Sequence, residues 1–112
     1  MNGFSLGLLA DEHLAIARGH ASGRSALTVH GGREHHLRQT LIALAAGHSL
    51  GEHDSPGEAT LQVLRGRVRL HAGGEEWQGV AGDYLVIPPQ RHDLEALEEA
   101  VVLLTVANRL AD

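Results

Sequence analysis

The 112-residue sequence has room for one domain with a single hydrophobic core and is too short for two. Hydrophobic residues make up 43% of it and charged residues 21%, which is typical of a folded globular protein and not of a disordered chain. A net charge of −5 without any basic run argues against a nucleic-acid partner, and the absence of cysteine excludes disulfides and thiolate metal sites.

All nine basic side chains are arginine, and the chain is rich in alanine, glycine and leucine, a bias that suggests a bacterial source with a GC-rich genome. Residues 1–10 lack the basic start and the long apolar run of a signal peptide. No stretch is apolar over the length that a membrane span requires. We therefore expect a cytoplasmic protein with no membrane partner.

The first predicted element is a short amphipathic helix from Ser5 to about His20, with Ser5 as its N-cap. Apolar residues recur there at helical spacing; they are Leu6, Ala10, Leu14, Ala17 and Ala21. We expect residues 1–24 to form this helix and a lead-in to the rest of the domain.

From residue 25 to residue 112 the pattern changes to short β-type runs separated by turn residues, which predicts an all-β barrel or sandwich. The clearest alternation of wet and apolar side chains lies in Arg67–His71. The predicted strands are Ser25–His30, Leu37–Ala45, Ala59–Leu64, Arg67–Ala72, Glu75–Val80, Tyr84–Pro88, Asp93–Leu97 and Val101–Ala107.

Two of these strands, Leu37–Ala45 and Val101–Ala107, are apolar on both faces, so each must be covered twice. The second cover is expected to be the N-terminal helix or another subunit, and we predict a homodimer. Gln39 shares a face with Leu41, which predicts a polar group inside the barrel near His53. The alternative for Gln39 is a hydrogen bond to a neighbouring strand.

A glycine and histidine motif begins at Gly47, just after the predicted strand Leu37–Ala45. The spacing G-x5-H-x-H-x3,4-E-x6-G is filled by Gly47, His53, Ser55, Ala59 and Gly66. In this segment the sequence resembles the cupin superfamily. Both glycines and the first histidine match the family pattern, whereas Ser55 replaces the second histidine and Ala59 replaces the carboxylate.

A second motif of the same family, G-x5-P-x-G-x2-H-x3-N, begins at Gly82 and continues through Pro88. Gln90 replaces its usual glycine, and His92 arrives one residue early. The resemblance covers residues 37–107 and implies an antiparallel jelly-roll barrel, also called a double-stranded β-helix, preceded here by the short α-helix.

The resemblance also implies a site for one divalent metal such as Fe, Mn, Ni or Zn, bound by histidines and a carboxylate. His53 and His92 are the two candidate ligands that remain. Two imidazoles alone rarely hold such an ion tightly. A metal site, a metal-free polar pocket and a purely structural role therefore remain open for these histidines.

Three functions follow from these alternatives. The first is binding of a small organic molecule in a barrel lined by Leu41, Leu61, Val63 and Leu85, with His53, Ser55, Gln39 and His92 as polar groups. Arg91 is then placed to meet an acidic ligand at the barrel mouth. The second is a metal-dependent oxygenase, isomerase or lyase acting on a small organic acid. The third is a dimeric interaction module that partners a regulator.

Overall fold

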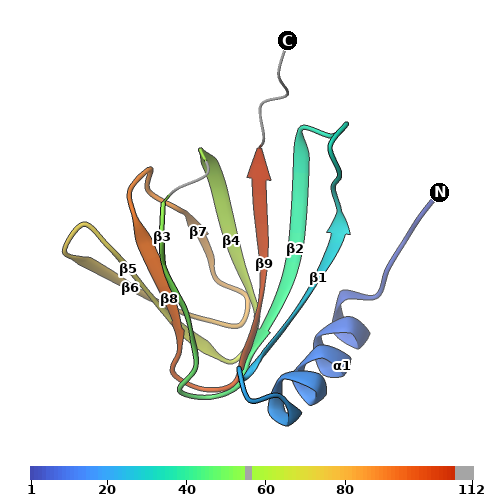
Figure 1. Cartoon of the computed structure of the whole chain (residues 1–112), viewed down its shortest axis with the longest axis horizontal. Coiled ribbons are helices and arrows are strands. Elements are labelled where there is room, and N and C mark those ends of the chain that lie inside the picture. The colour runs from blue at the N-terminus through green and yellow to red at the C-terminus, as the bar shows by residue number, and fades with distance from the viewer. Residues whose placement is uncertain (55–56, 108–112) are drawn as a thin grey trace.

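The computed structural model describes residues 1–54 and 57–107, so the candidate site residue Ser55 lies outside the described residues. One helix is followed by a succession of short strands (Figure 1). The elements are α1 (Leu6–Gly19), β1 (Arg24–His30), β2 (Leu37–Leu44), β3 (Ser49–His53), β4 (Glu58–Arg65), β5 (Arg67–Ala72), β6 (Glu75–Val80), β7 (Tyr84–Val86), β8 (His92–Ala96) and β9 (Ala100–Ala107).

The strands form two sheets that face each other across one interior. The larger sheet has the order β1-β2-β9-β4-β7 and the smaller one the order β3-β8-β5-β6. Every strand pairing is antiparallel. The predicted all-β jelly-roll barrel with a short N-terminal helix is therefore confirmed.

The main hydrophobic core lies between the two sheets, because alternate residues of each strand point inward. On β5, for example, Val68 and Leu70 are buried while Arg67 and His71 are exposed, as the sequence pattern predicts. The buried members of this core are Ile42, Leu44, Ala59, Leu61, Val63, Val68, Leu70, Ala72, Ile87, Leu94, Ala96, Ala100, Val102 and Val106.

Helix α1 covers the outer face of the larger sheet and forms a second apolar cluster. Its N-cap is Ser5, whose hydroxyl oxygen accepts a hydrogen bond from the Leu8 amide at 3.2 Å. The buried members of the cluster are Ala10, Leu14, Ala17, Leu41, Ala43, Val101 and Leu103. Strands β2 and β9 are therefore covered on both faces, as predicted, and the helix is the second cover. No helix within the described ranges is long and apolar enough to cross a membrane.

An ion pair fastens the last turn of α1 to the turn between β8 and β9. Arg18 donates two hydrogen bonds to the Glu99 carboxylate, one of them from Nε at 2.7 Å. This guanidinium holds the pKa of Glu99 below its ordinary value. Because both side chains are largely exposed, the pair adds little to stability.

The bounds of β1, β2, β4 and β9 differ from the predicted ones by one residue, and three further differences affect the candidate site. Strand β3 was missing from the predicted set, because Ser49–His53 contains one apolar residue, Leu50, and a β-bulge interrupts its alternation. Strand β7 ends at Val86 rather than at Pro88. Strand β8 begins one residue earlier than predicted, at His92, and this change brings that histidine into the smaller sheet.

Candidate functional site

One end of the barrel collects most of the candidate residues. It is the end at which β2 and β4 begin and β9 ends, at the top of Figure 1. Pairing places Arg38, Val106 and Ala59 side by side across the larger sheet, and His53, His92 and Ala72 side by side across the smaller one. We call these six residues the mouth layer.

His92 points into the barrel despite its displacement in the motif. It alternates along β8 with Leu94 and Ala96, which belong to the interior core. Its side chain is opposite Ala72 of β5, another core residue, and is 4% exposed. His92 is the only polar residue that is buried in the described part of the chain.

His53 reaches the same site because of the bulge in β3. Leu50 pairs with Leu94 and His53 pairs with His92, so three steps along β3 match two steps along β8. With strict alternation from the inward-pointing Leu50, His53 would point outward. The extra residue reverses this, so His53 points toward the barrel interior. His53 is exposed at the rim and stands over the buried His92, with 4.4 Å between the ring centroids and an angle of 67° between the rings.

Both imidazoles are oriented by backbone carbonyl groups. Nδ1 of His53 lies 2.9 Å from the carbonyl oxygen of Gly51, and Nδ1 of His92 lies 2.8 Å from that of Gln90. A carbonyl oxygen only accepts hydrogen bonds, so each Nδ1 must carry the proton and donate it. Neither Nε2 atom has a hydrogen-bond partner among the described residues. In the neutral rings these two atoms are free acceptors.

The donor set does not fit a tightly bound divalent metal. Ala59, in the family's carboxylate position, is 2% exposed and belongs to the apolar interior. Glu58, its acidic neighbour, is exposed on the other side of β4. Within residues 1–54 and 57–107 no three histidine or carboxylate side chains are grouped so that they could hold a metal ion. The two imidazoles supply at most half of a tetrahedral ligand set.

The expected position of Gln39 is wrong, and so is that of Leu41. Both point to the outer face of the larger sheet, where Leu41 packs under α1 and the Gln39 amide donates to the Thr105 hydroxyl at 3.2 Å. The hydrogen bond to a neighbouring strand, the alternative for Gln39, is the one observed. The opposite face of β2 lines the barrel instead, and it carries Arg38 and Thr40 above Ile42.

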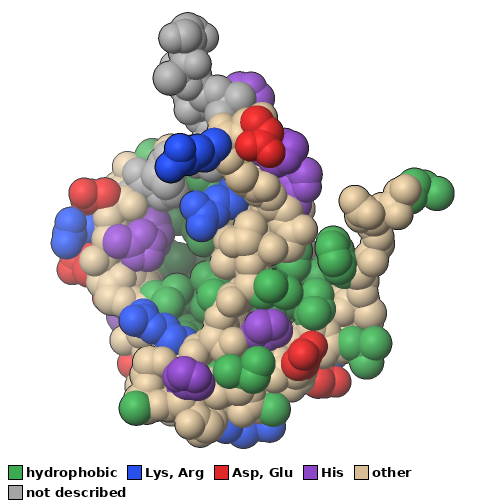
Figure 2. Space-filling view, turned by 45° about the vertical axis from the view of Figure 1, so that its right-hand side comes forward, with side chains coloured by type: hydrophobic (Ala, Val, Ile, Leu, Met, Phe, Trp, Pro, Cys, Tyr) green, Lys and Arg blue, Asp and Glu red, His purple; other side chains and the backbone are tan. Residues whose placement is uncertain are grey.

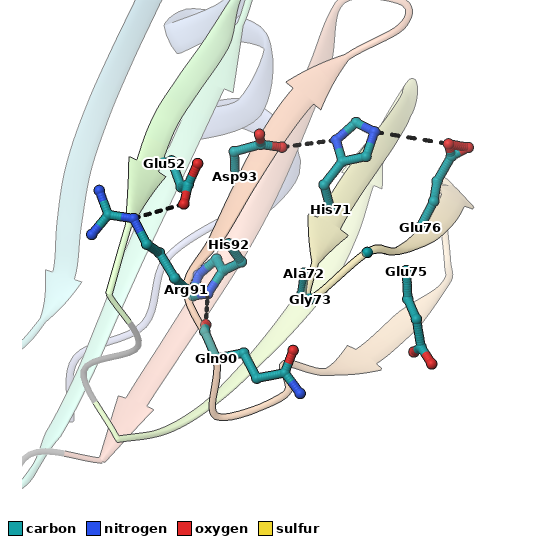
Figure 3. A pocket seen from close by; sticks show the side chains of 11 residues that line it. Glu52, His71, Ala72, Gly73, Glu75, Glu76, Gln90, Arg91, His92 and Asp93 are labelled. Atoms are coloured by element: carbon teal, nitrogen blue, oxygen red, sulfur yellow. Dashed lines mark hydrogen bonds and ion pairs between the residues drawn. The ribbon is translucent and has the colours of Figure 1, made fainter.

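Arg91 precedes His92 and is engaged by two carboxylates, of which Figure 3 shows Glu52. Its Nε donates to Glu52 at 2.7 Å and its Nη1 to Asp54 at 3.0 Å. Hydrogen bonds and charge from these two residues raise the pKa of the Arg91 guanidinium. Its charge is therefore balanced within the protein. Arg91 joins the turn before β8 to the end of β3, where Glu52 and Asp54 lie.

A pocket of about 600 Å³ lies at the mouth layer, and its lining includes His92 and Ala72 together with the charged residues Glu52, Glu75, Glu76, Arg91 and Asp93. Figure 3 shows Asp93, His71 and Glu76 in a row on three neighbouring strands. His71 Nδ1 donates to Asp93 at 2.9 Å, and its Nε2 lies 3.8 Å from Glu76. Asp93 and Glu76 are thus engaged by His71, and Glu52 is engaged by Arg91, so these three carboxylates offer little to a ligand.

The barrel interior itself offers a different surface. Figure 2 shows a hollow with hydrophobic walls and with histidine and arginine side chains around its opening. Sequence reasoning missed Arg38, the arginine of the mouth layer, because it assigned the other face of β2 to the interior. The helical pattern of residues 5–20 is the signal that could have corrected this, since the apolar face of an amphipathic helix must pack against an apolar sheet face.

Comparisons with known proteins agree with this architecture. Residues 40–107 match the family model described as "Cupin domain". No curated protein matches the chain. A conserved protein of unknown function from Streptococcus pyogenes is 27% identical, with a TM-score of 0.72 over 82% of this chain and 80% of that one.

Two other similar structures come from proteins of different function. A single-residue mutant of salicylate 1,2-dioxygenase from Pseudoaminobacter salicylatoxidans is 19% identical with a TM-score of 0.75. The match covers 93% of this chain and 34% of the dioxygenase. An HTH_3 family transcriptional regulator from Vibrio cholerae is 20% identical with a TM-score of 0.66, over 77% of this chain and 51% of the regulator. These likenesses concern the fold alone.

Proposed function

The chain belongs to the cupin domain family, and from this we propose that it binds a small organic molecule in the interior of its barrel. The observation that carries the proposal is His92, which is 4% exposed, alternates along β8 with the core residues Leu94 and Ala96, and has its Nδ1 fixed by the Gln90 carbonyl. Apolar walls with a few oriented polar atoms are typical of small-molecule sites. His53 at the rim adds a second oriented acceptor, and Ser55 stays a predicted contact.

A metal-dependent enzyme is the second candidate, because Nδ1 donation to a carbonyl leaves Nε2 ready to bind a metal in both histidines. The missing carboxylate at Ala59 weighs against it. The fold does not decide between the two functions, since it is shared with both a dioxygenase and a regulator. We therefore place binding before catalysis.

Replacing His92 with leucine tests the binding proposal. Small organic molecules that raise the melting temperature of the wild type are expected to lose roughly ten-fold or more in affinity, because an oriented acceptor is removed from the site. The matched control is His71→Leu, which removes an imidazole from the outer face of the same sheet. Thermal shift and calorimetry give the affinities. Equal affinities for wild type and His92→Leu would place the ligand outside the barrel.

We also propose that two copies associate through the outer face of the larger sheet beyond α1. Tyr84 and Val86 are 61% and 63% exposed there, beside the uncharged Thr60 and Gln62. An exposed apolar patch on an uncharged sheet face is typical of a protein interface.

Replacing Tyr84 with glutamate is expected to shift the mass of the particle from two chains to one, because a charge would be buried at the interface. Val80→Glu is the control, since Val80 is an exposed apolar residue on the smaller sheet. Light scattering at micromolar concentration measures the mass. A wild-type monomer would refute the association, and a Tyr84→Glu dimer would refute this face.

A further inference from the structure

The two sheets meet less closely at the seam between the edge strands β1 and β3, which we call the open side. Each of these strands has a neighbour on one side only, β2 for β1 and β8 for β3. The opposite seam is closer, because β6 contacts β4 and a pocket there is lined by residues of both β6 and β7. A molecule that enters the barrel from the β1–β3 side therefore passes the inner faces of β1, β2 and β3.

Two arginines belong to the inner faces of β1 and β2. Arg24 pairs with Leu44 and Arg38 pairs with Val106, and both partners are interior core residues. Directly opposed residues of an antiparallel pair point to the same face of the sheet, so both arginines project on the barrel side. Arg38 is in the mouth layer, in the same tier as His53 and His92.

Neither arginine has an acidic partner among the described residues. The arginines of α1, of β5 and of the turn before β8, by contrast, all form ion pairs: the pairs are Arg18–Glu99, Arg67–Glu98, Arg69–Glu95 and Arg91–Glu52. The one acidic residue on the inner face of a described strand is Glu75 of β6, which pairs with Ala72 of β5 and lies on the seam between β6 and β7. The open side therefore carries two uncompensated guanidinium groups and no carboxylate within the described strands.

We infer that the ligand of this barrel is a small organic anion, a carboxylate with an apolar body, and that Arg38 binds its charged group. This inference rests on the proposed function and names its ligand class. A guanidinium offers two parallel donors that match a carboxylate. The apolar body would lie against Ile42 and Leu61, and a hydroxyl of the ligand can donate to the free Nε2 of either histidine.

Three probes of the same shape test the charge: benzoate, benzyl alcohol and benzylamine. We expect benzoate to bind the wild type roughly ten-fold or more tightly than benzylamine, since only benzoate pairs with Arg38. Titrations followed by ¹H–¹⁵N NMR give the affinity and show where each probe binds. Benzoate is expected to shift amide signals of β2, β4 and β8 on the barrel side.

The matched variants are Arg38→Gln and Arg33→Gln, which remove neighbouring exposed arginines from β2 and from the turn before it. Arg38→Gln is expected to weaken benzoate roughly ten-fold or more, whereas Arg33→Gln should leave it within about two-fold. The same spectra show whether each variant is folded.

Each of the other outcomes would overturn a specific part of the inference or of the proposed function. Benzylamine binding better than benzoate inside the barrel would overturn the anion inference and leave the proposed function standing. Equal losses in Arg38→Gln and Arg33→Gln would overturn the role of Arg38. Failure of all three probes to bind at about 10 mM would overturn the inference together with the proposed function.

Discussion

Gly66→Ala is expected to lower the free energy of unfolding by about 3 kcal/mol or more. Gly66 turns the chain between β4 and β5 with a φ of +74°. A Cβ at this position would lie 1.9 Å from the carbonyl oxygen of Glu99 and 3.0 Å from Cα of Ala100. Both are backbone atoms, so the clash can be relieved only if one of the two turns moves.

The matched control is Gly47→Ala, at the other glycine of the first motif. Its φ is +81°, but a Cβ there would meet nothing within 4 Å. Only the left-handed conformation is penalised, at about 1–2 kcal/mol. Urea unfolding followed by circular dichroism measures both variants. Equal losses would mean that Gly66 is required for its conformation alone and not for the close approach of the two turns.

The barrel was predictable from the sequence because its local signals agree with one another. Val68 and Leu70 alternate with charged residues, which fixes which face of β5 is buried. Glycines occupy the turns that need a positive φ, such as Gly66. The helix was predictable in the same way, from apolar spacing and the cap at Ser5. Each signal is local and does not depend on distant pairing.

The direction of β2 was not predictable from its own composition. Leu41 and Ala43 on one face are as apolar as Ile42 and Leu44 on the other. Which pair faces the barrel depends on where α1 packs, and that contact joins segments far apart in the chain. The sequence pattern therefore predicts Gln39 inside the barrel and does not identify Arg38, one residue earlier.

The candidate site shows the same limit. Motif spacing identified His53, but its inward direction depends on a bulge that strand periodicity does not reveal. The free charge expected at Arg91 is absent, because the turn before β8 brings Arg91 to two carboxylates on the β3 side. Such pairings follow from the register between strands, which the sequence of one strand does not fix.

The largest expected effect at the site comes from restoring the missing carboxylate with Ala59→Glu. Ala59 is an inward residue of the mouth layer, so a glutamate there would face the tier of His53 and His92. Without metal the variant should lose several kcal/mol of stability, because a carboxyl group is buried among apolar side chains. With Ni²⁺ or Zn²⁺ it should gain a third ligand and bind the ion about 100-fold more tightly than the wild type.

Binding on this scale has a measurable consequence for stability, since metal at 100 times its Kd raises the free energy of unfolding by about 2.7 kcal/mol. Thermal unfolding with and without metal therefore reports the site even if the metal-free variant is only marginally folded. Ala96→Glu is the matched control: Ala96 is 0% exposed on the same inner surface, but lies at the far end of β8 from His92. It should be destabilised as strongly and gain nothing from metal.

Adding His53→Ala to Ala59→Glu separates a built site from general metal binding. The double variant should lose the metal-dependent stabilisation, because only His92 and the new carboxylate remain. Retention of the effect would mean that other groups bind the metal. Failure of Ala59→Glu itself to respond would mean that residue 59 does not face the two imidazoles. A response confined to Ala59→Glu would identify this one substitution as what separates the present barrel from a metal centre.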